Sequence, residues 1–387
     1  MLKKNSPGRC HLFVILLILP LLIFPGKAAA MPLSDASSPI PAAAMKLVQF
    51  CTDPQGQFDS QAATTLVDYV LAAKTERESD LPKLKDAPGA YYEFDTRINF
   101  AGFLQYSYGK QIPSSLTSPA SLRYSLWSGI SGEEQKLTGN WIPLPADGKP
   151  LIICGLQRDG ITPDLHTGIY YEYNLKKTYI LLNHKGRQVL ISISKQIDIS
   201  DIGKKGVILG SDDDWNYYYS DIPGSTKTGL GWIKSYIYDY FSVGVHAESV
   251  SAPATVRSGI FQWIRAGWSG INFVQTSHII NGIKRNARNT KLILESPHLP
   301  AAKQLAATYR QLAALPHNDL IDRYTALQQA RQSLAVASGK FATKEIKQQT
   351  YAHIPKEQIL EELMLEYFKN RMGKHSLLGE KAGCGIN

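Results

Sequence analysis

Residues 231–246, GWIKSYIYDYFSVGVH, decide the architecture that the sequence predicts. Hydrophobic side chains recur here at every second position, which is the period of a β-strand with one buried face. The serine and the carboxylate within this apolar row are candidates for contact with a ligand. The interior face of the expected strand carries Ile233, Ser235, Ile237, Asp239, Phe241, Val243 and Val245.

The hydrophobic period changes after this strand. From Ala254 to about Glu295 hydrophobic residues recur at steps of three and four, with a proline at position 253 and another at 297. This pattern predicts one long helix. Gly267 and Gly270, on either side of Trp268, indicate close approach to another backbone, and they also leave open two helices broken at that point. The apolar face of the helix would carry Val256, Ile260, Ile264, Trp268, Ile271 and Val274.

The chain before residue 231 has the pattern of an antiparallel sheet. A strand is expected over 92–104, and a helix from Ser118 to about Gly129 interrupts the series. Because turn signals are frequent and no crossover helix separates the later strands, we predict an α+β fold with antiparallel pairing. Hairpin turns are expected at 174–177 and 183–187. The later strands are expected at 141–144, 151–156, 168–175, 178–183, 188–194 and 206–219.

Two of these strands carry apolar rows like that of 231–246. With the long helix as a cover, the rows would enclose a common interior. Periodicity does not measure volume, so a ligand cavity and a filled core are both compatible with the sequence. The rows are Val189, Ile191 and Ile193 on one strand, and Val207, Leu209, Trp215, Tyr217 and Tyr219 on the other.

This order of elements resembles the START-like (helix-grip) superfamily over about residues 88–296. The junction from Gly231-Trp232 through Tyr240-Phe241 to Phe261-Gln262-Trp263 carries the resemblance. The resemblance implies a curved antiparallel sheet that packs on a long C-terminal helix, with a cavity between them. It also implies a binding or carrier module for an apolar ligand, although some members of the superfamily are cyclases or hydrolases.

Two segments lie outside the resemblance. Residues 31–87 are expected to form a flexible leader, a helix capped by Asp59 or Ser60, and a charged linker. Residues 297–387 are rich in Ala, Leu, Gln and Lys and are expected to form a helical appendage. Its helices are expected at 300–315, 319–337 and 356–372.

Eight residues are the predicted ligand contacts. Tyrosine suits a pocket mouth or a partner-facing sheet surface, because it is apolar along its ring and polar at its tip. Asp239 either contacts the ligand or pairs with Arg265, since a buried carboxylate needs a partner or a raised pKa. His278 is either a contact or a hydrogen-bonded structural imidazole. The eight are Trp215, Tyr217, Tyr219, Ser235, Asp239, Phe241, Trp268 and His278.

No motif in the sequence defines a catalytic residue, a metal site or a cofactor. Asp212, Asp214 and Asn216 have the spacing that begins a calcium loop, but Tyr217 and Pro223 stand where glycine and glutamate are required, which favours an exposed acidic turn. The leading prediction is a carrier of an apolar or amphipathic small molecule, such as a lipid. The alternatives are a hydrolase or cyclase that uses Asp239, His278 or the 212–214 cluster, and a non-catalytic interaction protein of the cell envelope.

The first thirty residues have the pattern of a secretory signal peptide. Basic residues precede an apolar run over 11–24, and small residues follow at 28–30. We therefore expect a periplasmic or secreted protein; an uncleaved membrane anchor is the alternative. Export permits a disulfide, and Cys51 with Cys154 is the first pair to test, because Cys384 lies in a glycine-flanked tail.

Charge is distributed unevenly along the chain. The formal net charge is +9, and residues 254–387 carry 18 basic and 9 acidic side chains. This basic third could contact a membrane surface or an envelope protein, or could be a solvated helical face. Nucleic acid is not expected as a partner, because export separates the chain from it.

Overall fold

The computed structural model describes residues 38–53, 56–74, 76–132, 142–227, 231–249, 253–342 and 351–379. The signal peptide expected over 1–30 and Cys384 lie outside these ranges. The strand expected at 141–144 is wrong: residue 141 lies outside these ranges, and residues 142–144 are described but form no strand. Among the described residues, no helix has the length and apolar character needed to span a membrane.

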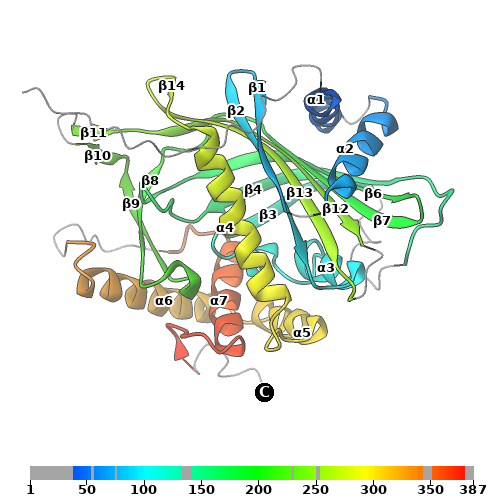
Figure 1. Ribbon diagram of the computed structural model, residues 1–387. Helices are drawn as coiled ribbons and strands as arrows, with labels where there is room; N and C mark the ends of the chain where they lie inside the picture. The colour runs from blue at the N-terminus through cyan, green and yellow to red at the C-terminus, as the bar shows by residue number, and fades with distance from the viewer. Residues whose placement is uncertain are drawn as a thin grey trace, which may run out of the picture. The chain divides into compact units, whose positions relative to one another are not determined.

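A large antiparallel sheet runs through the fold (Figure 1). Its strands pair in the order β1-β2-β13-β12-β7-β6-β4-β3, and β14 pairs with the end of β13. The N-terminal hairpin therefore lies beside the last long strand of the chain. The strands are β1 (Glu78–Leu84), β2 (Ala87–Thr96), β3 (Leu122–Gly132), β4 (Leu151–Ile161), β6 (Glu172–His184), β7 (Arg187–Gln196), β12 (Tyr236–Glu248), β13 (Val256–Trp268) and β14 (Ile271–Asn272).

Helices cover both faces of this sheet, and two small sheets complete the fold. One small sheet has the order β5-β8-β9 and the other pairs β10 with β11. Their strands are β5 (Ile169–Tyr170), β8 (Lys204–Ile208), β9 (Tyr217–Pro223), β10 (Ser225–Lys227) and β11 (Gly231–Ile233). The helices are α1 (Pro39–Thr52), α2 (Ser60–Ala72), α3 (Phe100–Ser107), α4 (Thr276–Leu294), α5 (Ala302–Ala313), α6 (His317–Ala337) and α7 (Lys356–Arg371), with 3-10 turns η1 (Ser114–Thr117) and η3 (Asp212–Asp214).

Helices α1 and α2 form a closed apolar core on one face of the sheet. Asp59 caps α2 by accepting a hydrogen bond from the N–H of Ala62 at 2.8 Å, which confirms one of the two predicted caps. Every second residue of the central strands faces these helices, because side chains alternate along a strand. The strand residues in this core include Ile191, Ile193, Phe241, Val243, Val245, Phe261 and Trp263.

Helix α4 packs on the opposite face, against β2 and β13 (Figure 1). Ile279 and Ile283 of α4 lie against Ala90, Ile260 and Ile264. These strand residues have the opposite parity to those under α1 and α2. The two faces of the sheet are thus both covered, but by different helices.

Helices α5, α6 and α7 extend the fold beside β3. Helix α7 is held there by a buried charge cluster in which Glu362 accepts hydrogen bonds from Arg123 Nε at 2.8 Å and Tyr324 Oη at 2.9 Å, and pairs with Arg331. The three helices lie close to the ranges expected from the sequence. They share an apolar core with strands of the sheet.

The prediction of one long helix over 254–295 is wrong for the first half of this range. Residues Val256–Trp268 form β13, and a helix begins only at Thr276. Ser269 and Gly270 have positive φ angles of 50° and 76° and turn the chain into β14. The close backbone approach inferred for Gly267 and Gly270 is confirmed at Gly267, where a Cβ would overlap the backbone oxygen of Ile271. It is wrong at Gly270, where a Cβ would meet nothing within 4 Å.

Other sequence predictions also need correction. The helix expected from Ser118 is replaced by β3, and η3 interrupts the strand expected over 206–219. The supposedly flexible segment 31–87 contains α1 and β1, as well as the expected helix. The strand predicted over 92–104 ends at Thr96 and is followed by α3, and the turn expected at 174–177 lies within β6, whereas that at 183–187 is present.

Cys51 and Cys154, the first pair to test for a disulfide, are both free thiols in the described structure. The two cysteines lie near each other but contact strand β6 separately. Cys51 Sγ donates to the carbonyl oxygen of Lys176 at 3.5 Å, and Cys154 Sγ accepts from the Thr178 hydroxyl at 3.5 Å.

Candidate functional site: a cavity with a polar floor

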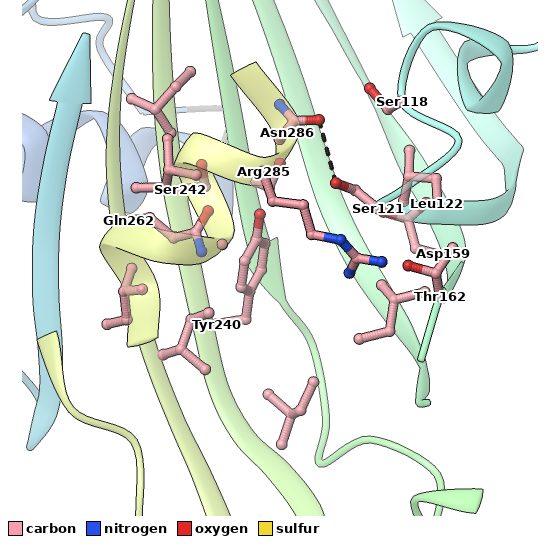
Figure 2. A pocket seen from close by; sticks show the side chains of 18 of the residues that line it. Ser118, Ser121, Leu122, Asp159, Thr162, Tyr240, Ser242, Gln262, Arg285 and Asn286 are labelled. Carbon is pink, nitrogen blue, oxygen red and sulfur yellow. Dashed lines mark hydrogen bonds between the residues drawn. The ribbon is translucent and has the colours of Figure 1, made fainter. Parts of the chain in front are cut away.

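A cavity of about 870 Å³ lies between the sheet and helix α4. Strands β4, β6, β7, β12 and β13 supply its floor, and α4 contributes its cover. Figure 2 shows Asp159, Tyr240, Ser242, Gln262 and Arg285 around this space, from four different elements. The same view shows Ser121 donating to Asn286 Oδ1 at 3.3 Å, a contact that ties α4 to the start of β3.

A row of polar side chains crosses the floor. Gln262 of β13 lies opposite Ser242 of β12, Ser242 lies opposite Ser194 of β7, and Ser194 lies opposite Lys177 of β6. All four line the cavity. Buried polar groups without partners destabilise a fold, so a packed core would place apolar residues here. The row therefore makes this part of the cavity floor polar.

An apolar wall lies next to this polar floor. Two isoleucines of helix α4 and two of strand β13 form it, and they belong to one hydrophobic cluster. At one end Trp268 stacks on Phe273 with ring centroids 3.8 Å apart. Leu165, 50% exposed, and Phe273, 43% exposed, both line the cavity and reach solvent, which places an opening here. The wall residues are Ile260, Ile264, Ile279 and Ile283.

Two ionisable groups of opposite charge lie in the floor. Lys177 Nζ donates a hydrogen bond to Ser194 Oγ at 2.7 Å, and burial lowers the pKa of its ammonium. Asp159 Oδ1 accepts from Ser125 Oγ at 2.7 Å, and burial raises the pKa of its carboxyl to about 6. No ion pair joins Lys177 to a carboxylate within 4.0 Å among the described residues.

His246 lies at another part of the floor as a neutral imidazole. Its Nε2 is 2.7 Å from the hydroxyl of Tyr108, and its Nδ1 is 2.8 Å from Ser258 Oγ. Burial lowers the pKa of His246 to about 3, with a further contribution from the charge of Lys177. Since both nitrogens have partners, the ring is held rigidly beside the cavity.

Three of the eight predicted contacts line this cavity. Ser235 shares a hydrogen bond with the hydroxyl of Tyr171 at 2.9 Å, and Trp268 lies near the opening. His278 Nδ1 accepts a hydrogen bond from the N–H of Gln275 at 3.3 Å and so caps α4. Ligand binding by these three residues stays a prediction.

The other five predicted contacts are placed elsewhere. Phe241 faces α1 and α2 on the opposite side of the sheet, because the apolar parity of β12 belongs to that core. Asp239 forms an ion pair with Arg265 at 2.7 Å, which is the structural alternative predicted for it. Arg265 is on β13, however, and not on a helix as expected. Trp215, Tyr217 and Tyr219 are packed in the core that includes α5, α6 and α7.

The acidic cluster at 212–214 forms ion pairs with arginines of α4. Arg285 binds Asp212 through Nε at 2.8 Å and Nη2 at 2.5 Å, and Tyr217 Oη donates to Asp212 Oδ1 at 2.9 Å. Burial opposes ionisation of Asp212, but Arg285 lowers its pKa below the ordinary value. Within the described ranges, no three His, Cys, Asp or Glu side chains are grouped as metal ligands.

The sequence interpretation missed the polar floor, although a signal for it was present. Ser192 and Ser194 alternate with the isoleucines of β7, and Tyr240 and Ser242 flank Phe241 on β12. Hydroxyl-bearing residues on one face of two central strands suit a sheet buried on both sides, with one side around a polar cavity.

Comparisons with known proteins do not identify the chain. No protein-family model matches, and no curated protein matches. Among solved structures, the human StarD13 (DLC2) lipid transfer and protein localization domain is similar over 61% of this chain and 98% of that chain, with 7% sequence identity and a TM-score of 0.25. A similarity this low supports no conclusion about ligand or function.

Proposed function

We propose that this chain binds an amphipathic small molecule, such as a lipid, in the cavity between the sheet and α4. The observation that carries the proposal is the combination of an apolar wall on α4 and β13 with a polar row on the floor strands. A ligand with an apolar body and a polar end would satisfy both surfaces at once.

The size of the space supports a ligand rather than a packing defect. Protein interiors leave few voids larger than a water molecule, and ligand sites span roughly 300–1,000 Å³. The cavity volume of about 870 Å³ lies in that range. Moreover, Ser107 Oγ and Gln157 Oε1 in its lining are buried and have no hydrogen-bond partner among the described residues.

Two of the carboxylates named for a hydrolase or cyclase are engaged in structural pairs, whereas His278, also named, lines the cavity. Asp239 binds Arg265, and Asp212 binds Arg285. These contacts favour the binding module over the enzyme. The location in the cell and the contact of the basic C-terminal third with a membrane or envelope protein are also proposals; they rest on the pattern of residues 1–30 and on the charge distribution.

Binding of a neutral fluorescent probe tests the proposal. N-phenyl-1-naphthylamine is added to the purified chain after delipidation, and native mass spectrometry is run on the undelipidated protein. We expect saturable fluorescence and a co-purifying small molecule. Ser242→Phe would fill the floor and weaken the probe at least about tenfold, whereas Ser242→Ala would change binding less than about threefold. No binding by the wild type, or equal binding by both variants, would refute the proposal.

A further inference from the structure

Two cationic side chains from the described residues line the cavity, apart from the histidines, and only one has its charge neutralised by a close partner. Arg285 is held in a two-point pair with Asp212 and also donates to the carbonyl oxygen of Pro163 at 3.4 Å. Lys177 instead donates to the neutral hydroxyl of Ser194. A lysine ammonium has three N–H donors, so Ser194 uses one of them.

Asp159, the carboxyl group whose charge acts on Lys177, already has another hydrogen-bond partner. Asp159 attracts Lys177 electrostatically but lies outside ion-pair distance, and its Oδ1 accepts from Ser125. Lys177 is half-buried where it lines the cavity, and an ammonium that lacks a close counter-ion is unfavourable in a weakly polar interior. A ligand that brings its own negative charge to Lys177 would supply the missing partner.

We infer that Lys177 is the recognition point for the anionic head group, carboxylate or phosphate monoester, of a single-chain amphiphile. This inference rests on the proposed function. Ser194 and Ser242 have hydroxyls, and Gln262 an amide, in the same row, so they can hydrogen-bond the head group while the chain lies along the isoleucine wall. A quaternary ammonium head at this position would be repelled by Lys177.

A displacement series measures the preference directly. The neutral probe N-phenyl-1-naphthylamine is bound first, and dodecanoate, dodecyl phosphate, 1-dodecanol or dodecyltrimethylammonium is then titrated at concentrations where none forms micelles. The four competitors share one chain and differ in the head group. We expect dodecanoate, dodecyl phosphate or both to displace the probe at about tenfold lower concentration than the alcohol and the cation. The two anionic arms show which head group the floor prefers.

Variants separate recognition from general apolar binding. Lys177→Met should keep probe binding and reduce the anion preference to less than about twofold, and Ser194→Ala should reduce it in part. Lys176→Met is the matched control, because it removes the same charge from the next residue, whose ammonium binds the carbonyl of Thr52 on the opposite face. It should leave the preference unchanged.

The outcomes distinguish this inference from the proposed function. If the wild type binds the probe but the alcohol competes as well as both anions, the anion site is refuted and the binding module stands. A preference that survives in Lys177→Met also refutes the anion site. If the probe does not bind the wild type at all, the proposed function itself fails. If Lys177→Met does not fold, the wild-type displacement series and the Ser194→Ala variant still test the anion site.

Discussion

Ser125 joins two buried carboxyl groups. Its hydroxyl donates to Asp159 Oδ1 at 2.7 Å in the cavity floor, and its backbone N–H donates to Glu361 Oε2 of α7 at 3.1 Å. Burial raises the pKa of Asp159 to about 6 and that of Glu361 to about 8. The cavity and α7 are therefore connected by groups whose ionisation opposes folding.

Replacing Asp159 by asparagine should make the chain more stable than the wild type near neutral pH. The pKa of Asp159 is raised in the folded state, so its stabilising contribution is present at low pH and is lost as pH rises through about 6. A shift of about two units corresponds to about 3 kcal/mol. Urea unfolding of wild type and Asp159→Asn at pH 4, 6 and 8 should show a difference that grows with pH by up to that amount.

Other charges around Asp159 are the same in both proteins. They are Lys177 of β6, Glu361 of α7, and the tyrosines Tyr173, Tyr179 and Tyr240. The charge of Asp159 contributes to the raised pKa of Glu361, so Asp159→Asn also lowers that pKa and adds to the difference at the upper end of this range. A difference that stays constant from pH 4 to 8 would show that Asp159 has an ordinary pKa.

Glu362→Gln should strongly destabilise the chain. Burial alone would raise the pKa of Glu362, but the charges of Arg123 and Arg331 lower this pKa to about 2. The neutral amide would leave two buried guanidinium groups without a counter-ion, at a cost of about 3–5 kcal/mol. Glu357→Gln, at an exposed position of the same helix, should change the unfolding free energy by less than about 0.5 kcal/mol. Equal urea midpoints for these two variants would contradict the role given to Glu362.

Two glycine-to-alanine changes should have opposite signs. A Cβ at Gly267 would overlap the backbone oxygen of Ile271 in the β13–β14 turn, so Gly267→Ala should destabilise the chain by about 1–3 kcal/mol. Gly282 lies in α4 with open space around the position of a Cβ, and alanine there should stabilise the helix by about 0.5–1 kcal/mol. Thermal unfolding of both variants gives the comparison, and a stabilising Gly267→Ala would show that the turn is not tightly packed.

The sequence predicted the α+β class and the antiparallel pairing, but it could not assign residues 256–268 to a strand from spacing alone. Val256, Ile260, Ile264 and Trp268 recur every four residues, which is close to one helical turn and is also an even number of strand positions. Phe261 and Trp263 lie between them and pack on the other face. An apolar residue on both parities is typical of a strand buried on both sides.

The cavity residues were missed for a related reason. Alternation along β12 showed two faces and did not show which one the ligand site would use. The apolar face was assigned to the cavity, yet it is covered by α1 and α2, while Ser242 and Tyr240 face the space under α4. Which helix covers which face depends on contacts between segments almost two hundred residues apart, and a local pattern contains no information about them.

Cys51 should resist both alkylation and oxidation in the native chain. Its thiol lies on α1, on the face of the helix that packs against β6 and β7, and this burial raises its pKa to about 11. At pH 8 roughly one thiol in a thousand would then be ionised, and the thiolate is the reactive form. Iodoacetamide labelling followed by peptide mass spectrometry should modify Cys51 more than about a hundredfold more slowly in the native chain than in urea. Cys154, which is partly exposed, is the internal control. Rapid native labelling of Cys51, or a peptide pair linking Cys51 to Cys154, would show that the packing of α1 against β6 and β7 does not protect the thiol as described.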